Sequence, residues 1–252
     1  MMTHVYELEV VRTVEPGRPI LLCIPGTYCS PVVFEGLDES AFPAVQLVPL
    51  SWMTSPGPWD IPALGRRVAQ LILDLGATSV LLAGHSTGGA IALAAAAAAP
   101  ERVSGLLLAD TGAHMHGHGD VASILTVIER GPGPEFFQAL MRRSFYHQPN
   151  AALIEQMIAY ASAAPREAAL QALRSQAALD LTDALPQLTM PAVVVHGRHD
   201  QARPLAHAEW LMQHLPRAEM VLLDCGHTPM VEMAPAFAQA VQRLCSLAGI
   251  SL

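Results

Sequence analysis

One serine stands between two glycines at the junction of an aliphatic run and an alanine-rich stretch. The run at 79–84 ends in Gly84, and Ser86 and Gly88 complete the pattern Gly-x-Ser-x-Gly. Where a strand turns sharply into a helix, this pattern lifts the serine side chain above the sheet, and a Cβ at either glycine would collide with its neighbours. The helix N-terminus then offers free N–H groups to a developing oxyanion. The spacing predicts a nucleophilic Ser86, although the same pattern can mark an ordinary strand-to-helix turn.

A serine hydroxyl needs a base to take its proton and a carboxylate to orient that base. Two later aliphatic runs end in suitable side chains, because Asp200 follows the run at 192–197 and His227 follows the run at 218–224. The carboxyl ends of parallel strands meet at one edge of a sheet, where ligands bind. Asp110, at the end of another run, is an alternative acid. The chain order Ser86, Asp200, His227 favours Asp200.

Four polar residues adjoin these positions and have other predicted roles. We expect His85 to pack or to form a hydrogen bond beneath the turn, facing away from the nucleophile. Asp224 is expected to brace the histidine loop. His196 and His199 flank the acid and are interpreted as polar neighbours of the site.

A histidine-rich run suggests a second kind of chemistry, which is metal binding. His114, His116 and His118 alternate and are followed by Asp120. The aspartate comes after the third histidine, and the further ligand clusters that a metallohydrolase needs are absent from the sequence. We therefore predict a solvated hinge here and no metal site.

The elements that must position these residues follow from a repeated pattern. Compact aliphatic runs predict buried strands, and helical patterns lie between several of them. Alternating strands and helices imply parallel pairing through crossover connections, and hence a mostly parallel, doubly wound α/β sheet. The predicted strands are 20–24, 45–50, 79–84, 103–110, 192–197 and 218–224.

One long stretch has no strand-like run. Between Thr111 and Leu185 the sequence contains only helical patterns, with Met, Phe, Tyr, Leu and Ile at spacings of three and four residues. We predict a helical cap at 112–185, inserted into an α/β core formed by 1–111 and 186–252. An apolar cap over the strand ends suits a hydrophobic acyl substrate, and the alternative is a helical subdomain without ligand contacts.

Composition excludes several classes of protein. The chain has 252 residues, of which 52% are apolar and 14% charged, and its net charge is −8. Disorder and nucleic-acid binding are therefore not expected. Every basic residue is arginine, so a pyridoxal Schiff base and a Walker-type phosphate loop are both excluded, and we expect no cofactor.

The same sequence predicts a cytoplasmic protein without a membrane partner. Its first residues lack the pattern of a secretory signal, and its longest apolar run has about ten residues where about 20 would cross a bilayer. The four cysteines have no metal-ligand spacing and are interpreted as reduced thiols.

Over essentially its whole length the sequence resembles the α/β-hydrolase superfamily. The resemblance rests on the serine motif, on the order of the three catalytic residues, and on Pro25-Gly26-Thr27, which follows the run at 20–24. It implies that backbone N–H groups of Thr27 and Thr87 form an oxyanion hole. Pro25 departs from the usual histidine, and this resembles acyl-transfer thioesterases and leaves the substrate class open.

A second departure concerns the predicted substrate pocket. The acidic, glycine-rich loop typical of the family is replaced by Pro-Leu-Ser-Trp-Met-Thr at 49–54. Tyr28, Trp52 and Met53, with Trp59, are candidates to line the pocket, and simple packing is the alternative.

The resemblance implies a cofactor-free serine hydrolase that forms an acyl-enzyme from an ester, thioester or lactone with a small hydrophobic acyl part. A non-hydrolytic role, as a lyase, a biosynthetic enzyme or a ligand receptor, is the alternative, because the fold does not fix the chemistry.

Overall fold

A computed structural model describes residues 7–119 and 121–251. In these residues the strands form one seven-stranded sheet with the order β1-β3-β2-β4-β5-β6-β7. Only β1 runs antiparallel to its neighbour, and the other pairs are parallel. The strands are β1 (Glu9–Val10), β2 (Ile20–Ile24), β3 (Gln46–Ser51), β4 (Val80–His85), β5 (Gly105–Ala109), β6 (Ala192–Gly197) and β7 (Ala218–Leu223).

The mostly parallel, doubly wound α/β sheet predicted from the sequence is confirmed. Each aliphatic run forms a strand, and β2 and β6 have the predicted bounds. The sequence analysis missed β1, a two-residue strand whose Glu9 pairs with Ser51 and whose Val10 pairs with Leu50 of β3. A pairing this short has no periodic pattern of its own, so only the neighbouring strand defines it.

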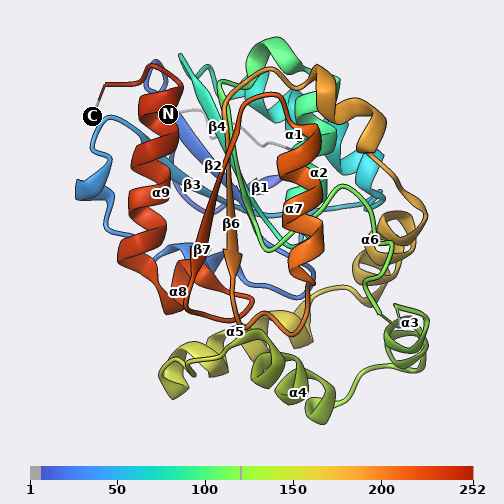
Figure 1. Ribbon diagram of the computed structural model, residues 1–252. Helices are drawn as coiled ribbons and strands as arrows, with labels where there is room; N and C mark the ends of the chain where they lie inside the picture. The colour runs from blue at the N-terminus through green and yellow to red at the C-terminus, as the bar shows by residue number, and fades with distance from the viewer. Residues whose placement is uncertain (1–6, 120, 252) are drawn as a thin grey trace.

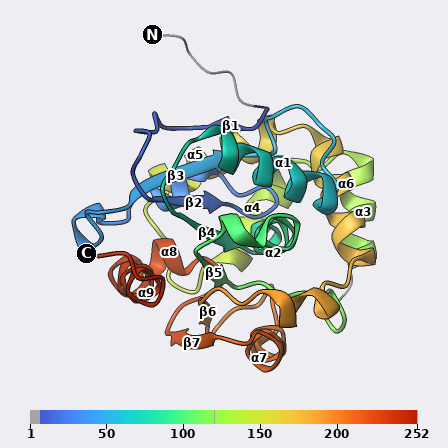
Figure 2. The ribbon, with the colours of Figure 1, turned by 90° about the horizontal axis from the view of Figure 1, so that it is seen from above.

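Helices cover both faces of the sheet (Figure 2). One face carries α1 (Ile61–Asp74), α2 (Thr87–Ala98) and α7 (Leu205–His214), and the other carries α9 (Ala234–Leu247) with the short turns η1 (Pro31–Phe34) and η2 (Glu39–Ala41). Two shorter elements complete the core, η3 (Pro100–Arg102) and α8 (Pro229–Glu232).

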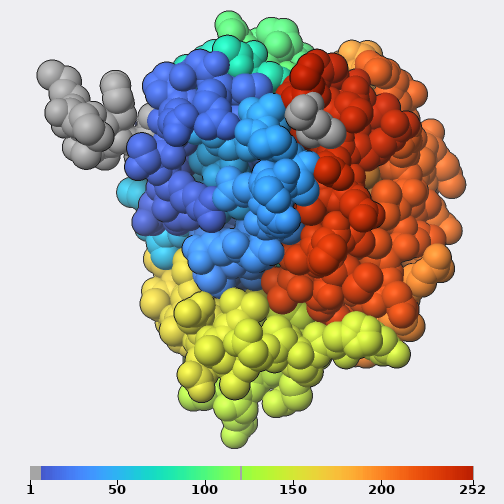
Figure 3. Space-filling view, turned by 90° about the vertical axis from the view of Figure 1, so that its left-hand side faces the viewer, coloured from blue at the N-terminus to red at the C-terminus, as the bar shows by residue number. Residues whose placement is uncertain are grey.

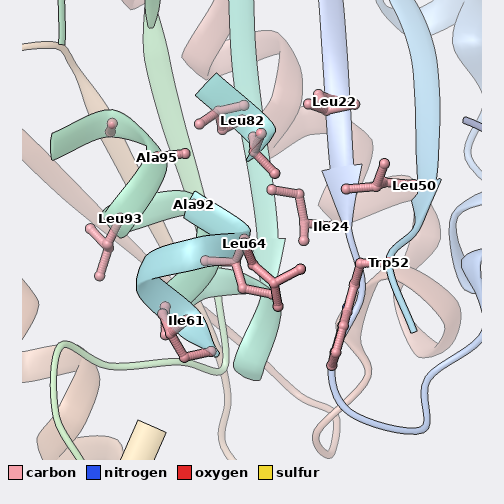
Figure 4. Close-up of a cluster of buried hydrophobic side chains, with 14 of the residues drawn as sticks. Leu22, Ile24, Leu50, Trp52, Ile61, Leu64, Leu82, Ala92, Leu93 and Ala95 are labelled. Atoms are coloured by element: carbon pink, nitrogen blue, oxygen red, sulfur yellow. The ribbon is translucent and has the colours of Figure 1, made fainter. Parts of the chain in front are cut away.

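Alternation along the buried strands divides the core into two layers. Leu22 and Ile24 of β2 belong to the cluster that faces α1 and α2, and Leu21 and Cys23 belong to the cluster that faces α9. Figure 4 shows Ile24 beside Leu64 of α1, with Leu22 farther along the same strand. Because neighbouring side chains of a strand point to opposite faces, a run that is apolar at every position is what a sheet covered on both faces requires.

A helical insertion separates β5 from β6. It contains α3 (Val121–Arg130), α4 (Pro134–Ser144), α5 (Ala151–Ala163) and α6 (Arg166–Ala178), followed by η4 (Thr182–Gln187). The insertion lies beyond the carboxyl ends of the strands (Figure 1), and its helices form one end of the molecule in Figure 3. The division into a core and a cap at 112–185 remains a prediction.

Two further features concern the length of the helices and the state of the cysteines. Among residues 7–119 and 121–251, no helix combines the length and the apolar character needed to cross a membrane. All four cysteines are buried and free.

Candidate active site

Ser86 occupies the turn between β4 and α2 in a strained backbone conformation. Its φ of 54° and ψ of −120° lie in a region that residues with a Cβ rarely adopt, at a cost of about 1–3 kcal/mol. Two hydrogen bonds hold this conformation. The N–H of Ser86 donates to the carbonyl of Ala109 at 2.9 Å, and the hydroxyl of Thr111 donates to the carbonyl of Ser86 at 2.6 Å.

Glycine is required on both sides of the turn because of close backbone approaches. A Cβ on Gly84 would lie 2.5 Å from the carbonyl oxygen of Gly88, and a Cβ on Gly88 would overlap the carbonyl oxygen of Ile24. The loop that follows β2 also packs closely against the turn, since a Cβ on Gly26 would lie 2.9 Å from the Cβ of Ser86. The steric reason for the glycine motif that the sequence predicted is therefore present.

The histidine and the aspartate predicted as partners form a direct hydrogen bond. His227 Nδ1 lies 2.7 Å from Asp200 Oδ2. The other carboxylate oxygen of Asp200 accepts the N–H groups of Ala202 at 2.6 Å and of Arg203 at 2.9 Å. Burial alone would raise the pKa of Asp200, but the charge of His227 and these hydrogen bonds outweigh it and lower the pKa well below its usual range. An ionised Asp200 requires the proton on Nδ1, which leaves Nε2 of His227 free as a base.

The loop that carries His227 is fixed from two sides. The carbonyl of Ser144, at the end of α4, accepts the N–H of His227 at 3.0 Å and the hydroxyl of Thr228 at 3.1 Å. His85 Nε2 lies 2.7 Å from the carbonyl oxygen of His227 and must therefore donate to it. Burial, followed by the charge of His227, lowers the pKa of His85 to about 3, so that this side chain is a neutral brace.

Asp110, the alternative acid, lies close to the pair, and its pKa is shifted in the opposite direction to that of Asp200. Its side chain is fully buried, and Oδ1 accepts the N–H of Gly197 at 2.9 Å. Burial, and then the negative charge of Asp200, raise the pKa of Asp110 well above its usual value. Neither of its oxygens is hydrogen-bonded to His227, and Oδ2 has no partner within the described residues.

Ligand atoms of Asp110, Asp200 and His227 lie within 4.8 Å of one another, a spacing that could suit a cation. Both oxygens of Asp200 already accept N–H groups, however, and Nδ1 of His227 carries the proton of that hydrogen bond. The donor pattern therefore fits a histidine oriented by a carboxylate better than it fits a metal centre.

Two backbone N–H groups beside Ser86 have no acceptor in the part of the chain that the structure describes. They belong to Thr27, after β2, and to Thr87, the first residue of α2. The side chains of the same residues form a chain of hydrogen bonds, from Thr27 Oγ1 to Thr87 Oγ1 at 2.9 Å and on to Gln176 Oε1 of α6 at 3.0 Å. Gln176 has no motif around it, so nothing in the sequence indicates this contact.

A cavity of about 120 Å³ opens beside Ser86 and His227, under the insertion. Its wall is largely apolar on the insertion side. Tyr28 lines it as predicted, and its ring centroid lies 5.4 Å from that of Phe137. The apolar lining residues of the insertion are Met115, Ile124, Ile128, Phe136, Leu140, Met141, Met157 and Leu173.

The prediction that Trp52 and Met53 line the pocket is wrong. Both side chains are fully buried behind the loop after β2, and neither belongs to the cavity wall. Trp52 Nε1 donates to the carbonyl of Pro25 at 2.8 Å, and Met53 Sδ accepts the N–H of Tyr28 at 2.9 Å. Trp59 is also absent from the cavity wall. Trp52 and Met53 therefore support the loop after β2, which carries Thr27.

The remaining polar candidates lie around the site without entering it. Asp224 is exposed, and its Oδ1 lies 2.8 Å from His199 Nε2, so this contact joins the loops after β6 and β7. His196 is buried, with Nδ1 3.4 Å from Asp110 Oδ1.

The histidine-rich run follows β5 and packs beside α7. The rings of His114 and His116 stack with centroids 4.6 Å apart, and His118 lines the cavity. Asp120 lies outside the described residues. Among the described residues, these histidines do not belong to any group of three ligand atoms within 4.8 Å.

Comparisons with known proteins agree with this architecture. The family model described as "Alpha/beta hydrolase family" matches residues 21–240. A pimeloyl-[acyl-carrier protein] methyl ester esterase of Nitrosomonas europaea is 30% identical over 191 residues, which is 71% of this chain and 76% of that protein. 3-Oxoadipate enol-lactonase 2 of Acinetobacter baylyi is 25% identical over 193 residues, covering 75% of this chain and 72% of that protein.

Solved structures share the fold across nearly the whole chain. An esterase from Exiguobacterium antarcticum superposes with a TM-score of 0.83 at 20% identity and covers 94% of each chain. The enol-lactonase from Burkholderia xenovorans superposes with a TM-score of 0.82 at 19% identity, covering 95% of this chain and 96% of that one.

Proposed function

The chain belongs to the alpha/beta hydrolase family, and we propose that it is a serine hydrolase that cleaves a carboxylic ester or lactone through an acyl-enzyme. One observation carries this proposal. A buried, ionised Asp200 orients His227 at the mouth of the same cavity into which the strained turn projects Ser86.

The geometry suits a two-step reaction. Ser86 Oγ attacks the substrate carbonyl while Nε2 of His227 takes the hydroxyl proton, and Asp200 stabilises the imidazolium that forms. The carbonyl electrons move onto oxygen, where the N–H groups of Thr27 and Thr87 stabilise the negative charge. His227 then gives its proton to the leaving alkoxide, and the carbonyl re-forms as the acyl-enzyme.

Water completes the cycle by the same route. His227 removes a proton from water as its oxygen attacks the acyl carbon, and returns that proton to Ser86 Oγ as the acid leaves. Every proton is carried by this chain's own residues, so the reaction needs no cofactor.

The similar proteins support the ester and lactone classes in particular. Among the relatives are methyl ester esterases and an enol-lactonase, and both reactions break a bond between an acyl carbon and oxygen. The apolar wall of the cavity suits an acyl chain of small or medium length.

A panel of p-nitrophenyl esters and lactones of graded chain length tests the proposal. We expect a burst of p-nitrophenol that approaches one equivalent per protein molecule, followed by slower steady turnover. Ligand binding without hydrolysis of any ester or lactone would instead support a receptor or another non-hydrolytic role.

A further inference from the structure

One arginine is sealed inside the molecule at the wall of the cavity. Arg203 follows Asp200 in the loop that leads to α7, and it is only 2% exposed. A fully buried arginine almost always has an acidic partner. Within residues 7–119 and 121–251, however, no carboxylate oxygen lies within 4.0 Å of its guanidinium group.

The unused hydrogen-bond donors of Arg203 all lie on one edge of the guanidinium group. Nη1 donates to Met115 Sδ at 3.1 Å and to His207 Nδ1 at 2.9 Å. Nε is buried without a partner, and Nη2 forms no hydrogen bond with any described residue. Nε and Nη2 together form the planar fork that binds the two oxygens of a carboxylate.

A neutral histidine holds the guanidinium in this orientation. Nδ1 of His207 accepts the hydrogen bond from Arg203, so its proton is on Nε2, which donates to the carbonyl of His116 at 2.9 Å. Burial, followed by the charge of Arg203, lowers the pKa of His207 to about 4. Burial lowers the pKa of Arg203 to about 10, against the charges of Asp200 and Asp110, which act to raise it, so the arginine stays charged at neutral pH.

Two further polar side chains lie in the neighbouring part of the cavity wall. Burial, followed by the charge of Arg203, lowers the pKa of His118 to about 3, so this histidine is neutral at neutral pH. Nδ1 of His118 is buried and has no partner within the described part of the chain. Arg143 lines the cavity as well, and its own hydrogen bonds go to the carbonyl of Gln201.

From this arrangement we infer that the substrate carries a free carboxylate, which binds to the unpaired Nε and Nη2 of Arg203 while an apolar chain lies along the insertion. The inference rests on the proposed function, since it names the substrate class of the same site. A carboxylate would supply the acceptors that Nε and Nη2 lack, and the rest of the wall is apolar enough to favour the connecting chain.

Matched esters test the inference. Monomethyl esters of the straight-chain dicarboxylic acids with four to eight carbons are compared with methyl esters of fatty acids of the same length. Acetyl esters of ω-hydroxy acids form a second series, in which the carboxylate is on the alcohol side. We expect kcat/KM to be about 30-fold higher for the best acidic ester than for its neutral counterpart, because a hydrogen bond to a charged group has this strength.

Variants of Arg203 identify the source of that preference. Arg203→Met keeps a similar volume without the charge, and we expect the ratio of kcat/KM for acidic over neutral esters to fall to about one, whatever the effect on neutral esters alone. Arg203→Lys keeps the charge without the fork and should retain only part of the preference. Arg142→Gln is the matched control, because Arg142 is exposed on α4 and outside the cavity wall. If Arg203→Met fails to fold, two results still test the inference: the preference of the wild type for acidic esters, and its partial loss in Arg203→Lys.

Binding of the free dicarboxylic acids to the wild-type protein, measured by calorimetry, separates this inference from the proposed function. Saturable binding that Arg203→Met weakens at least about tenfold supports the inference, even if no ester is hydrolysed and the proposed function is wrong. Hydrolysis of neutral and acidic esters at equal rates, without binding of the free acids, would overturn the inference and leave the proposed function intact.

Discussion

The two walls of the cavity are built in different ways. On the core side, Ser86 and His227 are held by backbone hydrogen bonds and by approaches so close that Gly26 and Gly88 cannot carry a Cβ. On the insertion side the wall consists of apolar side chains from amphipathic helices, and Leu140 is typical of them. Hydrogen bonds also join the two walls, among them those from the loop of His227 to Ser144 and from Thr87 to Gln176.

This difference assigns different tasks to the walls. Directional contacts with backbone groups fix atoms to within fractions of an ångström, which the chemical step requires. Apolar contacts depend mainly on the area they bury, so they select substrates by size and tolerate exchange. Changes on the core side should therefore lower kcat, and changes on the insertion side should act on KM and on chain-length preference.

The largest effect is expected from the nucleophile itself. Ser86→Ala should lower kcat/KM by at least about 10⁴-fold, because only binding and the oxyanion hole remain. Steady-state assays with the best ester measure the loss, and thermal unfolding checks that the variant is folded. Ser246→Ala, at an exposed position of α9, is the control and should retain full activity. Turnover of Ser86→Ala near the wild-type rate would show that the core-side wall does not carry the chemical step through Ser86.

The next largest effect separates the two buried acids. Asp200→Asn should lower kcat by about 10³–10⁴-fold, because the amide favours the wrong tautomer of His227. Asp110→Asn should lower kcat by less than about tenfold, since the amide resembles the neutral acid that this site favours. Steady-state kinetics of both variants give the ranking. The reverse ranking would make Asp110 the catalytic acid.

A single methyl group on the core side should have an intermediate effect. Gly26→Ala places a Cβ 2.9 Å from the Cβ of Ser86, and the resulting displacement should lower kcat by about 10–100-fold. Gly36→Ala is the matched control, because nothing lies within 4 Å of its Cβ position. Equal kcat values for the two variants would show that the loop after β2 is more adaptable than its packing indicates.

A substitution on the insertion side should act on binding. Leu140→Ala removes apolar surface from the cavity wall, so KM for medium-chain esters should rise about 3–10-fold while kcat stays within about twofold. Val127→Ala, at an exposed position of α3, should change neither constant. A fall in kcat for Leu140→Ala comparable to that for Gly26→Ala would contradict the separation of tasks.

The last prediction concerns the effect of Asp110 on stability rather than on turnover. The pKa of Asp110 is higher in the folded than in the unfolded protein, so its contribution to stability is complete below about pH 4 and is lost as pH rises toward the folded pKa. Between pH 5 and 7 the unfolding free energy of the wild type should fall relative to Asp110→Asn by up to about 1.4 kcal/mol per pH unit. Parallel curves from urea unfolding would show that Asp110 is ionised in the fold.

The sequence predicted the core wall well because local constraints determine it. A short run of aliphatic and β-branched residues that is apolar at every position indicates a strand covered on both faces, and the motif from Gly84 to Gly88 needs the glycines wherever a strand turns this sharply into a helix. The hydrogen bond between Asp200 and His227 follows from the positions of two strand ends.

The insertion wall and the supporting contacts could not be predicted in the same way. The helices of the insertion were evident from their periodicity, but which side chains face the cavity depends on how these helices pack. Trp52 follows β3 and resembled a pocket residue, yet the chain turns it inward against Pro25. Arg203 and Gln176 form hydrogen bonds with segments that are distant in the sequence. Neither residue has a neighbouring motif, so the sequence alone does not indicate these contacts.

Covalent labelling of the nucleophile tests the central claim most directly. The protein is incubated with an organophosphonate that reacts with activated serines, and mass spectrometry of the intact protein and of its peptides gives the number and the position of adducts. We predict a single adduct, on Ser86, that forms in step with the loss of esterase activity and is absent from Ser86→Ala. An adduct on another residue that accounts for the loss, or full labelling of Ser86 with activity retained, would contradict the account.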